Sequence, residues 1–259
     1  MTAPAVHVFE HRLLSYQRTF RGSLFSSFLQ PALFLTALGV GLGALINQSG
    51  SAAAALGGVP YLVFLAPGLL AGTAMQTATF ESTFPVMAAI RWVRSYHAML
   101  ATPISVTDIV VGQLAWIAVR LTMVAAIFVV IMTLFGAVRS PAILLAIPAA
   151  VLTGMAFSAP IAAFSATQEN AEGFNILFRF IINPLFLFSG TFFPVEQLPA
   201  LLHPIAYATP LYHGVALARQ LSLGTGAVTE LVVHVGVLLA YFAVGAWAAL
   251  RTFRQRLVK

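Results

Sequence analysis

Six long apolar stretches alternate with short polar ones along the chain. They cover residues 24–46, 61–80, 109–135, 142–166, 174–192 and 228–250. An α-helix of about 20 apolar residues crosses the ~30 Å hydrocarbon core of a bilayer, so each stretch is long enough to span it. The stretches are continuously apolar and lack the alternation of apolar and polar residues found in β-barrel strands. The pattern therefore predicts an all-α polytopic membrane protein, residues 1–259, with six transmembrane helices in a single domain.

Residues 5–21 precede the first span and follow a different, amphipathic pattern. Apolar side chains recur at helical spacing and share one face, whereas most polar and basic side chains lie on the other. The apolar face consists of Val6, Phe9, Leu13, Tyr16 and Phe20. This pattern predicts an interfacial helix in the headgroup layer, with its basic face toward anionic membrane lipids.

The segment between spans five and six is apolar but broken by prolines. Pro194, Pro199, Pro204 and Pro210 divide about 30 residues. The segment is too interrupted for one continuous span and too apolar for an ordinary loop. Irregular backbone at membrane depth is tolerated where it packs on protein or faces water. We therefore expect two short re-entrant helices that enter the outer leaflet, in which His203 and His213 are interfacial polar residues.

The composition supports a membrane protein and excludes several other classes. The chain is 60% hydrophobic and 8% charged, whereas soluble domains are about a quarter charged. The net charge of +6 comes from basic residues that flank the spans, so we do not expect nucleic-acid binding. The chain has no cysteine, which excludes disulfides, thiolate catalysis and cysteine-ligated metals.

The distribution of basic residues predicts the orientation of the spans. With both termini in the cytosol, nine basic residues lie on the cytosolic side: Arg12, Arg18, Arg21, Arg91, Arg94, Arg251, Arg254, Arg256 and Lys259. Only Arg139 and Arg219 then lie outside. An excess of Lys and Arg marks cytoplasmic loops, so this asymmetry favours six spans with both ends in the cytosol.

The loop between spans two and three stands out because it is polar and cationic. Residues 22–80 contain no charged residue; Glu81, Arg91 and Arg94 follow, flanked by Pro85 and Pro103. We interpret this cytosolic loop as the lever through which a soluble motor moves a membrane pathway.

Several polar residues occur inside the predicted spans. Thr73, Gln76 and Thr77, followed one turn later by Phe80, form a mildly polar stripe on span two. This stripe could be helix–helix contact or the wall of a pathway. Arg120, in span three, could extend its side chain to the interface or pair with Glu81 or Glu172. We expect the first of these two arrangements.

No pattern of residues predicts an enzyme. The chain lacks a phosphate-binding loop with a lysine, a G-x-S-x-G motif and an H-E-x-x-H motif. His7 and His11 have metal-ligand spacing, but no third ligand is evident nearby, so we expect no metal. Six spans are few for a gated pathway unless two chains build it. The alternatives are a subunit driven by an external energy source, a secondary carrier or channel, and a membrane enzyme acting on lipid.

Three stretches resemble the permease subunits of ABC-2 type exporters. They are YLVFLAPGLLAGTAMQTATFE at residues 61–81, YHAMLATPISVTDIVVGQLAW at 96–116 and NPLFLFSGTFFPVEQLPALLHPIAYATPLYHGVALAR at 183–219. The chain is most similar to the branch that contains nodulation protein J, with the daunorubicin-exporter permeases as wider relatives. The resemblance covers nearly the whole chain, and the pattern F-x-S-G-x-F-F-P-x-x-x-L-P is its most specific part.

The resemblance implies a permease in the bacterial cytoplasmic membrane that has no catalytic residue or cofactor of its own. Two such permeases would form a homodimer or a paralogue heterodimer, and two separate ATPase subunits would bind ATP and Mg. The coupling helix would cover residues 87–96, and the outer re-entrant helices residues 195–207 and 211–221. The residues expected to couple to the ATPase are Glu81, Arg91, Trp92, Arg94 and Tyr96.

The expected cargo is amphipathic: a lipo-oligosaccharide, a glycolipid or a hydrophobic drug. Two copies would meet through spans one, two and five, and cargo would contact residues that face this seam. The candidates are Phe34, Thr73, Gln76, Phe80, Asn175, Phe178 and Phe186, of which Phe186 is placed farther out as a gate.

Overall fold

The computed structural model describes residues 4–17, 28–50, 54 and 56–258. All regular secondary structure in this part of the chain is helical, which confirms the all-α prediction. The helices are α1 (Pro4–Gln17), η1 (Leu35–Leu42), α3 (Gly43–Gln48), α5 (Tyr61–Ser82), α6 (Phe84–Met87), η2 (Ala88–Trp92), α7 (Ser95–Leu100), α8 (Val106–Leu134), η3 (Pro141–Leu145), α9 (Ala146–Thr167), α10 (Glu172–Leu177), η4 (Phe178–Ile182), α11 (Asn183–Phe188), η5 (Val195–Gln197), η6 (Ala200–Leu202), α12 (His203–Ala208), α13 (Pro210–Leu223) and α14 (Val228–Leu257).

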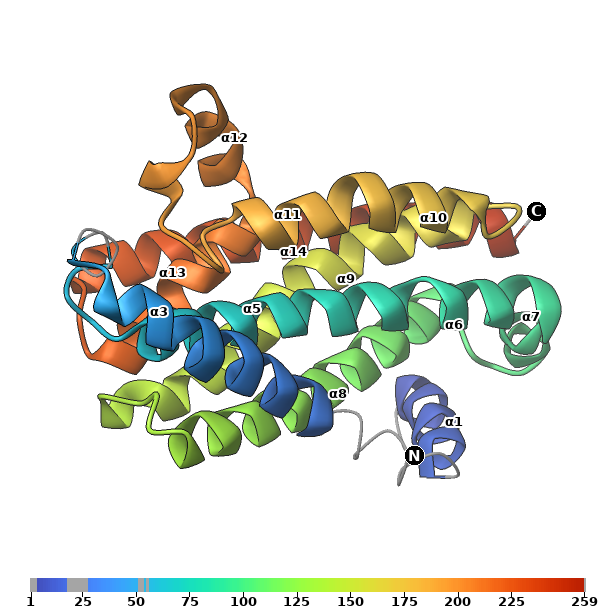
Figure 1. Cartoon of the computed structure of the whole chain (residues 1–259). Helices are drawn as coiled ribbons and strands as arrows, with labels where there is room; N and C mark the ends of the chain where they lie inside the picture. The colour runs from blue at the N-terminus through green and yellow to red at the C-terminus, as the bar shows by residue number, and fades with distance from the viewer. Residues whose placement is uncertain (1–3, 18–27, 51–53, 55, 259) are drawn as a thin grey trace.

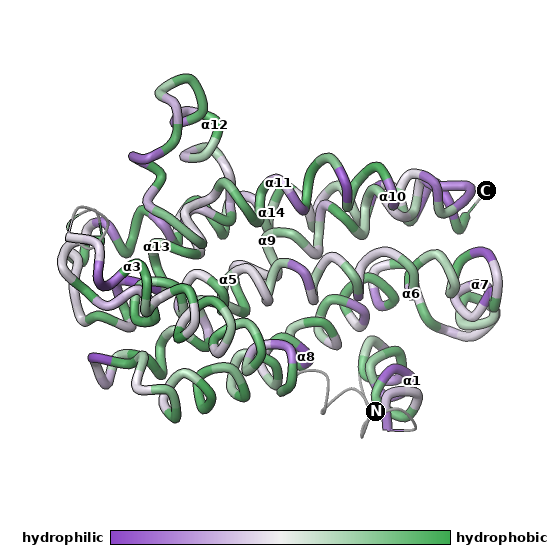
Figure 2. Tube along the Cα trace, in the orientation of Figure 1, coloured by the Kyte–Doolittle hydropathy of each residue, from purple (hydrophilic) through white to green (hydrophobic). Residues whose placement is uncertain are grey.

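The long helices run side by side as one bundle (Figure 1). Among the described residues, five helices are long and apolar enough to cross a membrane. They are Phe28–Gln48, Tyr61–Trp92, Val106–Leu134, Pro141–Thr167 and Val228–Leu257. These five match predicted spans one to four and six, except that residues 24–27 of the first span lie outside the described residues. In Figure 2 the long helices are mostly hydrophobic, and hydrophilic stretches appear around α7 and near the C terminus.

The predicted fifth span is a shorter helix. It consists of α10, η4 and α11, of 6, 5 and 6 residues, and is therefore about 25 Å long at 1.5 Å per residue. It ends before Gly190, whose φ of 83° is a left-handed geometry that glycine adopts without steric cost. The helix therefore stops several residues before position 192, where we expected the span to end.

Helix α5 forms the centre of the bundle. It packs against α8, α9, α13 and η1, and 78% of its most apolar 18-residue window is buried. By contrast, 11% of the corresponding window of α14 is buried. Consequently α5 is surrounded by protein, whereas α14 presents most of its apolar surface outward.

Helix α8 begins at a capping box that the sequence encodes. The Ser105 hydroxyl accepts from the backbone N–H of Asp108 at 3.2 Å, and the Asp108 carboxylate accepts from the backbone N–H of Ser105 at 2.9 Å. These bonds satisfy N–H groups that have no partner within the helix. The cap fixes where the loop between α5 and α8 ends and a helix of 29 residues begins.

Two predicted helices are segmented in the structure. The coupling segment, residues 87–96, runs through the end of α6, η2 and the start of α7, and Arg94 breaks it with a left-handed φ of 55°. The first outer helix, residues 195–207, consists of η5, η6 and the start of α12. Pro199 and Pro204 explain this break because proline lacks the N–H that a continuous helix needs. In Figure 1, α12 projects from the bundle at the end opposite α7.

Candidate transport cavity and coupling loop

A cavity of about 630 Å³ lies between the first span, α5, α8 and the η4–α11 helix, with α1 at its edge. Much of its wall consists of hydroxyl and amide side chains, although the surrounding helices are apolar. These side chains are Gln30, Thr73, Gln76, Thr77 and Asn183. Polar side chains inside transmembrane helices usually face protein or a water-filled cavity rather than lipid. The polar stripe on α5 thus lines a cavity instead of serving only as helix contact.

Four of the seven predicted pathway residues line this cavity: Thr73, Gln76, Phe80 and Phe178. The other three do not. The side chains of Phe34 and Asn175 are exposed. Phe186 packs edge-on against Phe192, with ring centroids 5.1 Å apart, and covers Gly72 so closely that a Cβ there would lie 2.3 Å from the Phe186 ring. Phe186 thus packs against Gly72 of α5 and does not line the cavity.

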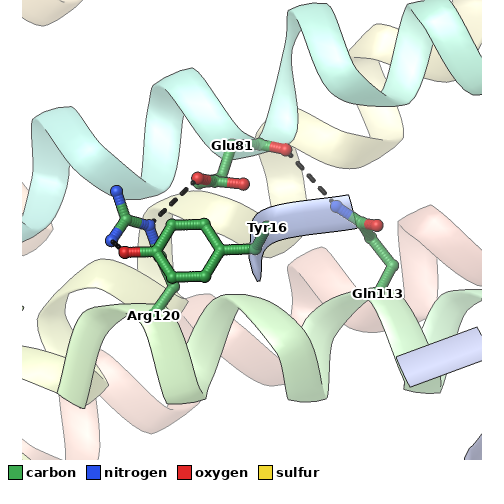
Figure 3. Close-up of polar contacts among 4 residues, drawn as sticks. All are labelled: Tyr16, Glu81, Gln113 and Arg120. Carbon is green, nitrogen blue, oxygen red and sulfur yellow. Dashed lines mark hydrogen bonds and ion pairs between the residues drawn. The ribbon is translucent and has the colours of Figure 1, made fainter. Parts of the chain in front are cut away.

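An ion pair inside the bundle closes one side of the cavity. Glu81 Oε1 and Arg120 Nε are 3.4 Å apart, and both side chains are largely buried, at 19% and 12% exposed. Arg120 also donates to the Tyr16 hydroxyl at 2.6 Å and lies over the Tyr16 ring. Figure 3 shows Glu81 and Tyr16 converging on Arg120 from two different helices. Our expectation that Arg120 extends to the membrane interface is wrong, because the guanidinium is held within the protein.

A second set of hydrogen bonds joins this ion pair to the loop between α5 and α8. Gln113 donates to the backbone carbonyl of Glu81 at 3.3 Å and accepts from the Tyr96 hydroxyl at 3.1 Å. Arg12 donates to the same hydroxyl at 2.8 Å and to the Pro85 carbonyl at 3.4 Å. A continuous path of polar contacts therefore runs from α7 through α8 to the end of α5, and α1 is attached to it.

The loop presents two hydrophobic side chains outward. Trp92 is 62% exposed and Val93 is 73% exposed. The neighbouring Arg91 pairs with Glu169 at 3.2 Å, which ties the loop to the turn between α9 and α10. Tyr96, which we expected on the surface with Trp92, is instead 1% exposed. It is therefore an internal contact of the loop and cannot anchor a partner in this conformation.

Comparison with known proteins identifies the family of this chain. The sequence model described as "ABC-2 type transporter" matches residues 8–223. Nodulation protein J of Rhizobium leguminosarum bv. viciae is 30% identical over 252 residues, covering 97% of this chain and 94% of that protein. The protein of the same name from Rhizobium meliloti (strain 1021) is 29% identical, covering 98% of this chain and 94% of its own length. The chain belongs to the ABC-2 type transporter family.

The polar network of this ABC-2 permease includes three residues for which the sequence predicted no polar contact: Arg12, Tyr16 and Gln113. Helical spacing could have identified them. Arg12 and Tyr16 are four residues apart on α1, while Gln113 and Arg120 are seven apart on α8 and flank Trp116 on one face. Trp116 contacts the rings of Phe9 and Tyr16, at centroid distances of 6.1 and 5.3 Å. Helix α1 is thus docked on α8, a contact that the prediction of an interfacial helix did not include.

Close approach of α1 to α8 in the permease depends on Gly112. A Cβ at this position would lie 2.7 Å from Val8 Cβ and 2.8 Å from the Ala5 carbonyl oxygen. Gly112→Ala should therefore push α1 away and destabilise the fold by about 1–3 kcal/mol, as overpacking does. The chain has no cysteine, so Val8→Cys, at a fully buried position, provides a specific probe. Maleimide labelling of the thiol in the Val8→Cys variant should accelerate at least tenfold when Gly112→Ala is added.

Gly236→Ala is the matched control, because nothing lies within 4 Å of a Cβ at that position. It should leave both the labelling rate and the unfolding temperature unchanged. Equal labelling rates in the Gly112 and Gly236 variants would show that the contact between α1 and α8 does not depend on Gly112.

The opposite end of the permease is held together by Arg219. Its guanidinium donates to the Gly190 carbonyl at 2.8 Å and the Phe64 carbonyl at 3.2 Å, and lies over the Phe64 ring. Nearby, His213 Nδ1 is 2.8 Å from His234 Nδ1, so His213 joins α13 to α14. No group of three metal-ligand side chains occurs in the described part of the chain.

Proposed function

We propose that this permease is one half of an ATP-driven exporter whose pathway includes the 630 Å³ cavity. The observation that carries the proposal is the position of this polar cavity among apolar spans, directly beside the Glu81–Arg120 pair that the loop network reaches. In an ATP-driven exporter, movement of the loop must change the shape of the wall that contacts the cargo. In this proposal both termini lie in the cytosol, and the η4–α11 helix supplies a sixth crossing.

The cavity supports an amphipathic cargo. Its volume of about 630 Å³ lies within the range of small-molecule sites, roughly 300–1,000 Å³. Amide and hydroxyl groups offer both hydrogen-bond donors and acceptors to a polar headgroup, and Phe80 and Phe178 add aromatic surface. A lipo-oligosaccharide, a glycolipid or a hydrophobic drug with a polar end would fit this chemistry, with its apolar part directed toward lipid.

A second permease would complete the pathway. The first span buries 22% of its most apolar window, and its side chains Phe28, Leu33 and Phe34 are exposed beside the cavity-lining Gln30. Phe180 and Ile181 are likewise exposed on the η4–α11 helix. We propose that these faces meet in a homodimer or a paralogue heterodimer, which places the two cavities near a common seam.

The force would come from separate ATPase subunits that bind ATP and Mg. Trp92 and Val93 are exposed, aromatic or branched, and held on a loop braced by Arg91 and Tyr96. Exposed apolar anchors beside arginine are typical of interface hot spots. Movement of the loop would reach the cavity through Gln113 and Glu81.

Filling the cavity tests the pathway. Thr73→Trp places an indole in the polar wall and should reduce ATP-dependent transport by at least tenfold, because cargo loses both space and hydrogen-bond partners. Transport is measured in inside-out vesicles with a fluorescent lipid-linked sugar and with a hydrophobic dye. Thr133→Trp, at an exposed position of α8 outside the cavity, is the control and should transport normally.

Normal transport by the Thr73→Trp variant would contradict the proposed pathway. Transport by either variant without an ATPase subunit would contradict the proposed energy source and indicate a secondary carrier or channel.

A further inference from the structure

A second cavity, of about 460 Å³, lies at the end of the molecule that carries α7 and the C terminus. It is built from three separate segments: the loop before α7, the end of α9 and the end of α14. Basic and polar side chains dominate its wall, namely Arg91, Arg94, His97, Thr167, Thr252 and Arg256. It shares no lining residue with the transport cavity.

Two of the three arginines that face this cavity have no ion pair among the described residues. Arg91 pairs with Glu169 at 3.2 Å. Arg94 and Arg256 have no acidic partner among the residues that the structure describes. Two uncompensated guanidinium groups therefore line one cavity, and an anion between them would relieve their mutual repulsion.

The backbone at Arg94 provides a second, independent observation. Its φ of 55° and ψ of 27° are left-handed, a geometry that costs free energy for any residue other than glycine. Such strained residues occur where the surroundings hold them, often at ligand-binding positions. Here the strained residue is one of the two unpaired cations of the cavity.

An exposed tryptophan on α14 indicates how this cavity lies relative to the membrane boundary. Trp247, which is 62% exposed, precedes Thr252 and Arg256 on α14, and Arg251 lies over its ring. Exposed tryptophans mark the boundary between membrane and water. At 1.5 Å per residue, Thr252 and Arg256 lie about 8 and 14 Å beyond Trp247 along the helix. The headgroup region extends about 5–8 Å beyond the hydrocarbon on each side. Thr252 therefore lies at its outer edge, and Arg256 reaches it by extending its long side chain back toward the membrane.

We propose that this basic cavity binds the phosphate of an anionic phospholipid from the cytosolic leaflet, an inference that rests on the proposed orientation of the chain. The arginines neutralise the phosphate and donate charge-assisted hydrogen bonds to its oxygens. Basic pockets between spans on the cytoplasmic side bind phosphorylated headgroups in this way. A lipid fits better than an acidic protein segment, because α14 is the span with the most exposed apolar surface and acyl chains can lie along it.

A bound lipid would brace the coupling loop against α9 and α14. Arg94 belongs to the loop and Arg256 to α14, so one phosphate would connect elements that no ion pair joins within the described residues. The anionic lipid content of the membrane would then influence how firmly the loop is held.

Native mass spectrometry of the purified permease complex tests the proposal with phosphatidylglycerol as the probe. Wild-type protein should retain one phosphatidylglycerol per permease chain, and phosphatidylcholine should not replace it. Arg256→Gln should weaken retention by about fivefold, the effect of removing one cation near a lipid surface. Arg254→Gln is the matched control: it removes the same charge from the same helix, but Arg254 bonds Thr107 at 3.3 Å and does not line the cavity.

Equal retention by the Arg256→Gln and Arg254→Gln variants would overturn the site. Displacement of the lipid by millimolar inorganic phosphate would show that the cavity binds free phosphate and would overturn the lipid assignment. Loss of the lipid whenever an ATPase subunit is bound would assign the cavity to protein docking instead. None of these readouts depends on transport, so their failure is distinguishable from failure of the proposed exporter function.

Discussion

Glu81→Ala should strongly destabilise the permease. It removes the carboxylate that faces Arg120, whose side chain is 12% exposed, and leaves a buried positive charge without its acidic partner. Breaking a buried ion pair from one side costs about 3 kcal/mol or more. For a protein of this size the unfolding temperature should fall by roughly 6–12 °C, measured by thermal unfolding of the detergent-purified protein.

Glu172→Ala is the control, because Glu172 is an exposed acid for which the described residues provide no ion pair. It should change the unfolding temperature little. The double variant Glu81→Leu/Arg120→Met should recover much of the lost stability, since replacing both charges with apolar groups of similar size leaves no charge unpaired. If Glu81→Ala unfolds at the same temperature as Glu172→Ala, the ion pair does not hold the cavity wall.

Trp92→Ala should weaken the binding of the proposed ATPase subunit to the permease. Trp92 is a large exposed aromatic side chain on a loop that is fixed from behind. Truncating a central hot-spot residue costs about 2 kcal/mol or more, which is roughly a thirtyfold loss of affinity. The proposed ATPase subunit should therefore bind at least tenfold more weakly, measured by titrating it onto the permease in nanodiscs.

Trp247→Ala provides a matched control, because Trp247 is also 62% exposed but lies on α14, outside the loop. It removes the same side chain without touching the loop and should leave ATPase affinity unchanged. Equal affinity for the two tryptophan variants would contradict the assignment of the loop as the docking surface.

Local chemistry made much of this fold predictable. Continuous apolar runs predict the spans because an unpaired backbone N–H or C=O group in hydrocarbon is costly. A helix pairs all of these groups within one segment. The capping box of Ser105 and Asp108 starts α8 at Val106, three residues before the start that we predicted from hydropathy. Thr73 and Gln76 were predicted as pathway residues and line the cavity, because polar side chains in a span face protein or a water-filled cavity rather than lipid. Phe80 and Phe178 were also predicted as pathway residues and line the same cavity.

Tertiary contacts decided what the sequence could not. Arg120 is paired inside the bundle because Glu81 and Tyr16 contact it from two other helices. The hydropathy of α8 alone does not indicate either contact. Tyr96 is buried for a similar reason: Gln113 and Arg12 meet its hydroxyl from distant parts of the chain. The break at Arg94 could not be predicted either. Arginine disfavours left-handed backbone dihedral angles, so this conformation depends on the surrounding structure.

The central claim is that this permease supplies a pathway and receives its force through the loop around Trp92. Crosslinking from Val93 tests it most directly, because Val93 is 73% exposed and the chain has no cysteine to compete for the label. A Val93→Cys permease carrying a photoreactive maleimide, purified from its native membrane, should crosslink to an ABC ATPase subunit. The same label on a Leu201→Cys permease, at the opposite end of the bundle, should not. Labelling of the Val93→Cys permease from outside intact cells, or transport by complexes that yield no ATPase adduct from that position, would contradict the account.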